Sequence, residues 1–181
     1  MLDTKIYSKT YVQKQLAKFK NRNNNHWKNR ISLAKQLVSN YASLPPATIL
    51  DLGCSIGTFA IEFSMDGYNT IGIDLDDHAL EEGQKLAEEL GCQPQWICTN
   101  ASDFSLDKQV DIVLCFDLLE HLIDEIIIGS LNRVQENLRP GGLFIFYTFP
   151  TEYDHVFIAS IFLVCLLFLF TDCQVKVLRI W

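Results

Sequence analysis

A short apolar run that passes into a glycine-containing turn and then into a helical pattern constrains this chain more than any other segment. Its letters are ILDLGCSIGTFAI, at positions 49–61. Gly53 and Gly57 permit a tight turn and a close approach of the backbone to a neighbouring group. The free N–H groups and the positive dipole end of the following helix favour an anionic or polar ligand. The segment therefore predicts a strand, a ligand-binding turn and a helix.

Three binding or catalytic motifs compete for this turn. The dinucleotide fingerprint G-x-G-x-x-G fails, because it needs glycines where Ser55 and Thr58 stand. The nucleophile elbow G-x-S-x-G fits the letters, with Ser55 as the nucleophile, but such an elbow usually follows several strands and only a polar, helix-like arm precedes this one. The third motif is D-x-G-x-G-x-G, with Asp51, Gly53 and Gly57 in place and Ser55 at the middle glycine. Asp51 favours this third motif, because a carboxylate at a strand end suits a cationic ligand group such as a methionine amino group.

The composition is globular, and the charge is unevenly distributed. The 181 residues are 49% hydrophobic and 20% charged, which suits one domain with a substantial core. Residues 1–35 contain nine Lys and Arg side chains and one Asp, a net charge of about +8, which leaves about −15 of the total of −7 for the remainder. This arm permits contact with nucleic acid or an anionic membrane, but we favour a solvated helix face that rests on an acidic body.

The cysteines and the N-terminus indicate a cytoplasmic protein. The six cysteines contain no C-x-x-C pair and fall mostly in apolar runs, at positions 54, 92, 98, 115, 165 and 173. This pattern is typical of reduced cysteines rather than of a disulfide or zinc framework. The N-terminus has no apolar h-region, so we expect no signal peptide.

Apolar periodicity predicts alternating helices and strands. Helical spacing runs from His26 to Tyr41, and two prolines at 45 and 46 end this helix. Further helices are predicted at 57–65, 78–90 and 122–138, and strands at 47–52, 69–74, 95–99, 110–116 and 143–149. This alternation predicts a doubly wound, mostly parallel α/β sheet. The chain divides into a helical arm (1–46), the sheet domain (47–150) and an apolar helix with a short tail (151–181).

Ligands of such sheets lie beyond the carboxyl ends of the strands. Asp74 ends the second predicted strand, 21 residues after Gly53. Its carboxylate can accept both hydroxyl hydrogens of a ribose through charge-assisted hydrogen bonds. Asp76 and Asp77 are predicted instead to cap the helix that follows.

The loop after the third predicted strand offers a second set of ligand contacts. Its letters are TNASDF, at positions 99–104. An adenine edge could meet the backbone of Ala101 or Ser102 and a side chain from Asn100 or Asp103, and the sequence does not choose between those two side chains. Phe104 either packs on the ring or belongs to the core.

Together these segments resemble the class I S-adenosylmethionine-dependent methyltransferases, and most closely the ubiquinone-biosynthesis O-methyltransferase type. The matching segments read ILDLGCSIG, IGIDLDD, CTNASDF, VDIVLCFDLLEHL and LRPGGLFIF, within residues 47–150. The resemblance implies a Rossmann-like fold with the N-terminal helices over the site. It implies that S-adenosylmethionine binds along Asp51, Gly53, Cys54, Ser55, Gly57, Asp74, Leu75, Asn100, Ala101, Ser102, Asp103 and Phe116.

The function implied is methyl transfer to a small-molecule oxygen, nitrogen or carbon nucleophile, with oxygen favoured. An alternative is a truncated, non-catalytic cofactor-binding protein that an apolar tail attaches to a membrane or partner. A nucleic-acid methyltransferase that uses the basic arm is a weaker third hypothesis.

The letters FDLLEH after the fourth predicted strand suggest a catalytic or metal-binding group. In a helical turn Asp117, Glu120 and His121 share one face, where their oxygen and nitrogen atoms can hold Mg²⁺ or Mn²⁺ and anchor a catechol-like or diol acceptor. The resemblance includes relatives that use such residues for metal and others that do not. His121 as a general base is a parallel hypothesis, and a third is that Glu120 and His121 bond one another and shape the pocket.

The tail departs from the family pattern. Only 31 residues follow Pro150, too few for the helix and antiparallel strand pair that end a full domain. Val156–Phe170 is a 15-residue apolar stretch, shorter than the roughly 20 residues that span a bilayer. We expect a buried or interfacial helix there, through which the chain self-associates or attaches to a membrane, and one last strand within Gln174–Ile180.

Overall fold

A six-stranded sheet with helices on both faces organises the part of the chain that the computed structural model describes, residues 9–21, 25–41, 45–147 and 174–178. The strands are β1 (Thr48–Leu52), β2 (Asn69–Asp74), β3 (Gln95–Cys98), β4 (Val110–Phe116), β5 (Leu138–Tyr147) and β6 (Gln174–Leu178). The helices are α1 (Lys9–Lys20), α2 (Asn25–Tyr41), α3 (Thr58–Met65), α4 (Asp77–Leu90), the short 3₁₀ helix η1 (Leu119–His121) and α5 (Asp124–Asn137).

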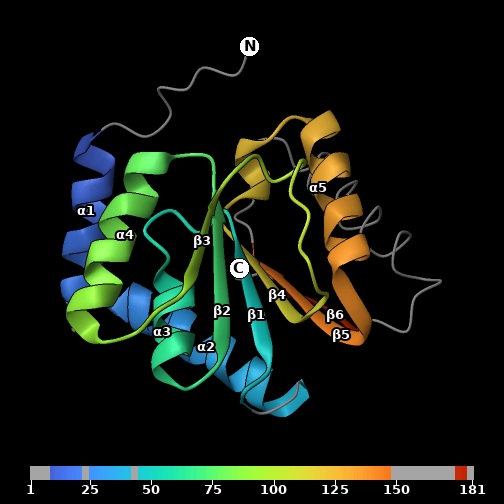
Figure 1. Ribbon diagram of the computed structural model, residues 1–181, viewed down its shortest axis with the longest axis horizontal. Coiled ribbons are helices and arrows are strands. Elements are labelled where there is room, and N and C mark those ends of the chain that lie inside the picture. Colours follow the sequence, from blue (N-terminus) through green and yellow to red (C-terminus); the bar gives the residue numbers. More distant parts are fainter. Residues whose placement is uncertain (1–8, 22–24, 42–44, 148–173, 179–181) are drawn as a thin grey trace.

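The strand order places a topological switch point beside β1. The order is β3-β2-β1-β4-β5-β6, and every neighbouring pair is parallel. The chain builds the sheet outward from β1 to β3, then returns to the other side of β1 as β4 (Figure 1). Loops after β1 and β4 therefore leave the same edge in opposite directions, which is where open α/β sheets bind ligands.

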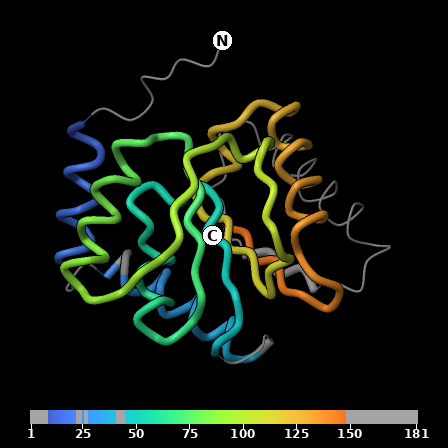
Figure 2. The backbone as a smooth tube through the Cα atoms, in the orientation of Figure 1, coloured from blue at the N-terminus to red at the C-terminus, as the bar shows by residue number. Residues whose placement is uncertain are grey.

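Two clusters of apolar side chains cover the faces of the sheet. Ile127, Leu131 and Val134 pack α5 against one face. Ala34 of α2 and Phe63 of α3 pack against the other, together with inward-facing residues of β1, β4 and β5. Figures 1 and 2 show the result, with α5 on one side of the sheet and α1, α3 and α4 on the other. The doubly wound fold predicted from the sequence is confirmed.

The basic arm rests on an acidic helix, as its charge pattern predicts. Val12 and Phe19 of α1 belong to an apolar cluster that includes Leu86 of α4. At the edge of this contact the Lys20 ammonium lies 3.7 Å from a carboxylate oxygen of Glu89. The positive charge of α1 therefore faces the negative charge of α4, and apolar burial between the helices supplies the larger part of the attraction because both charges are exposed.

The last strands differ from the prediction. We expected a helix to residue 138 and a strand from 143, but β5 begins at Leu138, which pairs with Val110 before the register shifts to the pair of Ile112 and Leu143. The Arg-Pro-Gly-Gly segment thus lies inside an irregular strand rather than between two elements. The predicted last strand is present as β6, parallel to β5, and the described part of the sheet contains no antiparallel strand.

The apolar stretch 156–170 lies outside the described residues. None of the helices within the described ranges is both long enough and apolar enough to cross a bilayer.

Candidate functional site

The turn between β1 and α3 has three residues in the left-handed region. The φ angles are +74° at Gly53, +50° at Ser55 and +70° at Gly57. The N–H groups of Gly53 and Cys54 both donate to the carbonyl oxygen of Ile73, at 2.8 and 2.9 Å. The predicted turn is therefore formed, and hydrogen bonds fix it to the carboxyl end of β2.

The glycine at the end of this turn makes room for an indole ring. A Cβ at Gly57 would lie 2.2 Å from Cη2 of Trp96, and one at Gly72 would lie 3.0 Å from the same ring. Gly83 of α4 completes the slot, because a Cβ there would meet the Ile56 carbonyl oxygen at 2.5 Å. Sequence reasoning assigned Gly57 to the close approach of a ligand, and the structure adds a packing requirement for glycine there.

Asp51 is buried beneath α3, the helix that follows the turn. One of its carboxylate oxygens accepts the backbone N–H of Ala60 at 3.0 Å, in the first turn of α3. Burial raises the pKa of Asp51 to about 7, the hydrogen bond from Ala60 lowers it in part, and the negative charge of Asp74 raises it further. The two carboxylates therefore repel one another, and a cation placed near both relieves that repulsion.

Asp74 joins the two turns on which the predicted cofactor site depends. Its Oδ2 accepts the N–H of Ser55 at 2.7 Å and its Oδ1 accepts the N–H of Asp76 at 2.9 Å. The residue is 8% exposed, and burial raises its pKa. Asp76 caps α4 as predicted, since its Oδ1 accepts the N–H of Ala79 at 3.2 Å, whereas Asp77 is the first residue of the helix rather than its cap.

The loop after β3 is held against α5. Asn100 folds inward, and its Oδ1 accepts both the N–H and the hydroxyl of Ser102 at 3.1 Å. Arg133 of α5 donates to the Ser102 carbonyl at 3.3 Å. Asp103 is exposed, and Phe104 is 2% exposed in the core, so its role is packing within the protein.

Buried oxygen atoms that lack a partner mark the carboxyl edge of the sheet. Four side-chain oxygens are buried with no hydrogen-bond partner among the described residues, and three of them follow β1, β2 and β4, namely Ser55 Oγ, Asp76 Oδ2 and Asp117 Oδ1. The fourth, Thr70 Oγ1, lies within β2. Unpaired buried oxygens are costly, so their concentration at this edge fits a polar ligand with hydrogen-bond donors.

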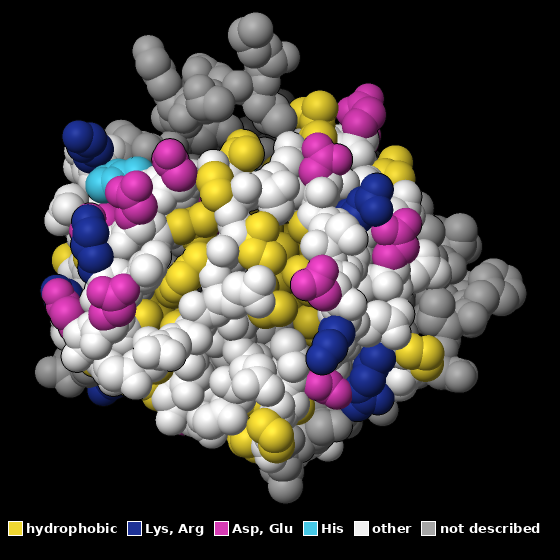
Figure 3. Space-filling view, in the orientation of Figure 1, with side chains coloured by type: hydrophobic (Ala, Val, Ile, Leu, Met, Phe, Trp, Pro, Cys, Tyr) yellow, Lys and Arg dark blue, Asp and Glu magenta, His cyan; other side chains and the backbone are white. Residues whose placement is uncertain are grey.

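A loop rather than a helix follows β3 on one face of the sheet. The connection from β3 to β4 contains no helix, and Ile71, Ile97 and Leu106 are only partly buried against the core. Figure 3 shows hydrophobic side chains gathered in the middle of this face, between charged side chains over α4 and over α5.

The segment after β4 does not form the predicted metal site. Asp117 has a left-handed φ of +54°, and the short η1 begins only at Leu119, so the α-helical spacing that would align Asp117, Glu120 and His121 is broken. Asp117 instead forms an ion pair with Arg30, and His121 is exposed. No group of three His, Cys, Asp or Glu side chains within the described ranges could hold a metal ion. The proposed donor set is therefore wrong.

Sequence reasoning missed Arg30 and Tyr147. Arg30 of α2 is 8% exposed, and its guanidinium lies 4.7 Å from the centroid of the Tyr147 ring. A signal was present, because Arg30 stands four residues before Ala34, within the apolar stripe of a helix. A charged residue inside such a stripe indicates a buried ion pair or a site.

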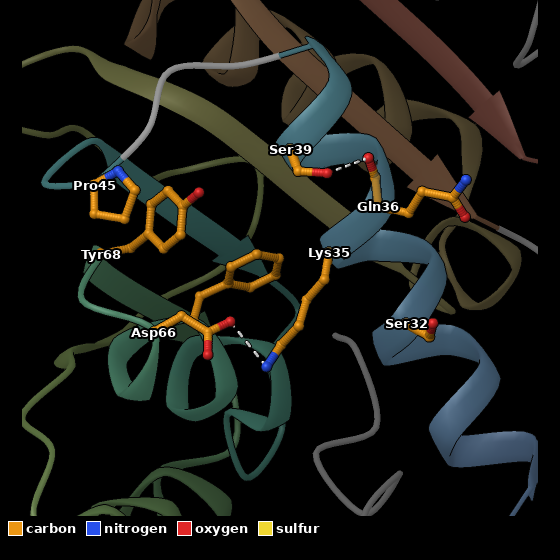
Figure 4. Close-up of a pocket in the computed structure, with 8 residues that line it drawn as sticks. Ser32, Lys35, Gln36, Ser39, Pro45, Asp66 and Tyr68 are labelled. Atoms are coloured by element: carbon orange, nitrogen blue, oxygen red, sulfur yellow. Dashed lines mark hydrogen bonds and ion pairs between the residues drawn. The ribbon is translucent and has the colours of Figure 1, made fainter.

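A groove of about 610 Å³ lies at the opposite edge of the sheet. Its lining includes Pro45 and Tyr68, which precede β1 and β2. The Lys35 ammonium contacts a carboxylate oxygen of Asp66 at 2.9 Å (Figure 4). It also lies 3.2 Å from a carboxylate oxygen of Glu62. This groove belongs to the amino ends of the strands and is separate from the candidate site.

The hydrolase alternative makes a clear prediction about Ser55. Its Oγ is buried with no hydrogen-bond partner among the described residues, so no described base can activate it. We expect a fluorophosphonate probe to leave Ser55 unlabelled, as measured by mass spectrometry of the intact protein and its peptides. Stoichiometric labelling of Ser55, absent from Ser55→Ala, would restore the nucleophile-elbow interpretation.

Comparison with known proteins identifies the family to which this chain belongs. A sequence profile described as a methyltransferase domain matches residues 49–142. Ubiquinone biosynthesis O-methyltransferases of Rickettsia felis and Rickettsia prowazekii are 24% and 28% identical over 152 residues, which is 75% of this chain and 61% and 59% of theirs. The chain thus spans about 60% of the length of these curated relatives.

A solved structure supports the fold. A S-adenosylmethionine-dependent methyltransferase from Clostridium acetobutylicum superposes with a TM-score of 0.61 at 24% identity, covering 69% of this chain and 51% of that protein.

Proposed function

The chain belongs to the methyltransferase-domain family, and from this premise we propose that it transfers a methyl group from S-adenosylmethionine to a small-molecule acceptor, with an oxygen atom as the nucleophile. The observation that carries the proposal is Asp74, a buried carboxylate at the end of β2 that accepts N–H groups from both adjacent turns. Each carboxylate oxygen has a second lone pair available, as a ribose diol requires.

The charges at the edge suit the rest of the cofactor. S-adenosylmethionine carries a positively charged sulfonium and a positively charged ammonium. The carboxylates of Asp51 and Asp74 repel one another, and a cation bound near them would relieve that repulsion. The N-terminus of α3, which follows the glycine turn, favours the carboxylate of the methionine moiety. We propose that the loop from Asn100 to Asp103 contacts the adenine.

The cofactor, when bound, supplies an activated methyl group on its sulfonium. The remaining contribution of the chain is to position the nucleophile in line with that methyl group and to exclude water, which is the larger part of catalysis in such transfers. Oxygen is the favoured nucleophile because the Rickettsia felis and Rickettsia prowazekii relatives are named as O-methyltransferases.

Asp74→Ala tests the cofactor assignment. We expect this change to weaken S-adenosylmethionine binding by about 1.5–3 kcal/mol, the range for hydrogen bonds to a charged group. Isothermal titration calorimetry on wild type and variant measures the effect directly.

Asp77→Ala is the matched control, because Asp77 is an exposed carboxylate in the first turn of α4, three residues away. It should lower the free energy of unfolding by at most about 1 kcal/mol, the contribution of an acidic residue near a helix N-terminus, while leaving cofactor affinity within a factor of three. Absence of binding by the wild type, or equal affinity in wild type and Asp74→Ala, would contradict the assignment.

A further inference from the structure

The indole ring of Trp96 lies in a slot that three glycines leave open. The glycines come from three different elements, Gly57 from the turn after β1, Gly72 from β2 and Gly83 from α4. A Cβ on Gly57 would lie 2.2 Å from Cη2 of the ring, and one on Gly72 would lie 3.0 Å from Cε3. A Cβ on Gly83 would lie 3.1 Å from Cη2. These atoms belong to the six-membered part of the indole, so the far end of the side chain is inserted between the turn, the strand and the helix.

Trp96 stands on the same face of the sheet as the proposed ribose carboxylate. It pairs with Gly72 in the register of β2 and β3, and two residues later Cys98 pairs with Asp74. Side chains two residues apart in a strand point to the same face. The indole therefore meets the turn from the face on which Asp74 lies.

The two halves of the glycine turn are held in different ways. The N–H groups of residues 53–55 donate to acceptors at the end of β2. The N–H of Gly57 donates within the turn, to the carbonyl oxygen of Cys54 at 2.7 Å. Ile56 belongs to the apolar cluster against which Trp96 packs. Hydrogen bonds thus fix the first half of the turn to the sheet, and the second half rests on the Trp96 ring.

The conformation of the turn needs this support. Ser55 is left-handed, at φ +50°, although it carries a Cβ, and such a backbone persists only where its surroundings over-determine it. Helix α3 begins at Thr58, directly after Gly57. The position of Gly57 therefore sets the position of the helix N-terminus that is proposed to receive the methionine carboxylate.

We propose that Trp96 is a positioning residue for the cofactor, because its ring holds the second half of the glycine turn in the arrangement that receives S-adenosylmethionine. The proposal rests on the proposed function and adds a residue that acts through the turn rather than by contact with the cofactor. Without the ring, the turn occupies this arrangement only part of the time. The apparent affinity for the cofactor falls by that fraction.

The test uses the full chain and two variants of Trp96. Trp96→Leu removes the ring. Trp96→Phe keeps a shorter ring, which reaches the space beside Gly72 but not the space beside Gly57. Amide hydrogen exchange of residues 53–57, measured without cofactor, reports opening of the turn directly. Calorimetry with S-adenosylmethionine then measures the Kd for each variant.

Phe63→Leu is the matched control. Phe63 is 1% exposed and lies in the last turn of α3. It packs in the cluster that contains Ile49 and Phe59, and none of the atoms nearest to the three slot glycines belongs to it. This variant also replaces an aromatic ring by leucine, so it destabilises the fold without emptying the slot.

We expect Trp96→Leu to raise the exchange rates of the 53–57 amides at least tenfold and the Kd for S-adenosylmethionine at least tenfold. Trp96→Phe should raise both at least threefold and less than Trp96→Leu does, and it decides the question alone where Trp96→Leu does not fold. Phe63→Leu should change both by less than threefold.

Unchanged exchange or an unchanged Kd in the Trp96 variants, or equal changes in Phe63→Leu, would overturn the proposal. The exchange measurement needs no cofactor, so it separates this proposal from the one on which it rests. Failure of the wild type to bind S-adenosylmethionine, with faster exchange still present in Trp96→Leu, would refute the proposed function instead.

Discussion

Gly57→Ala is expected to lower the free energy of unfolding by about 2–5 kcal/mol. The new methyl group would lie 2.2 Å from the Trp96 ring, and the backbone would keep a φ of +70° with a Cβ attached. Overpacking of this kind costs about 1–3 kcal/mol, and the left-handed conformation adds about 1–2 kcal/mol. Urea unfolding followed by circular dichroism measures the loss.

Gly91→Ala measures the cost of the left-handed backbone without the cost of overpacking. Gly91 has nearly the same φ, +74°, at the end of α4, but no atom lies within 4 Å of the position of its Cβ. Gly91→Ala should therefore lower the free energy of unfolding by only about 1–2 kcal/mol.

A second comparison places Gly57→Ala in a Trp96→Leu background. The smaller side chain should reduce the cost of the new methyl group, giving a coupling free energy of about 1–3 kcal/mol. Equal losses for Gly57→Ala and Gly91→Ala, or no coupling to residue 96, would show that the indole is not what requires glycine.

Asp51→Asn is expected to remove a pH dependence of stability. The native pKa of Asp51 is about 7 against 3.8 for an ordinary carboxyl group. Between these values the native state binds the proton more tightly than the unfolded state does, so the free energy of unfolding falls as pH rises through this window. At 1.36 kcal/mol per pKa unit the full loss is about 4 kcal/mol and is complete above pH 7. The variant should therefore exceed the wild type in stability by up to that amount at pH 8.

The amide preserves the contact that matters for folding. Its oxygen can still accept the N–H of Ala60, so helix α3 keeps its bond while the buried charge is removed. Urea unfolding at pH 5 and pH 8 checks the difference, with Asp107→Asn, an exposed carboxylate, as the control. A wild type whose stability does not change across this range, or a variant that retains the wild-type slope, would contradict the expectation. Because Asp51 is proposed to face a cationic cofactor, the same variant should bind S-adenosylmethionine more weakly.

Local sequence signals were sufficient to predict most of the fold and the part of the candidate site that lies at the ends of β1 and β2. The strand that ends at Asp74 and the helix that Asp76 caps follow from short-range patterns, because alternation of apolar segments and cap residues act within a few positions. The ligand edge then followed from the parallel topology alone. The switch-point turn at Gly53 to Gly57 is where these patterns place it.

The failures concern contacts between distant segments. The left-handed backbone at Asp117 broke the helical spacing on which the metal hypothesis depended, and no local pattern at that position announced it. Trp96, which contributes the neighbour that excludes a Cβ at Gly57, stands 39 residues away in the chain. The bulged start of β5 was missed because Pro-Gly-Gly normally interrupts a strand. Such features are decided by tertiary packing rather than by propensity.

The ion pair between Arg30 of α2 and Asp117 after β4 also constrains the order in which parts of the chain can fold during synthesis. Arg30 precedes Asp117 by 87 residues, and at a synthesis rate of about 5–20 residues per second it leaves the ribosome roughly 4 to 17 s before its partner. Until β4 and β5 exist, the apolar stripe of Ile31, Ala34 and Val38 lacks most of the sheet residues against which it packs. Helix α2 is therefore synthesised early but completes its packing only after β4 and β5 have formed.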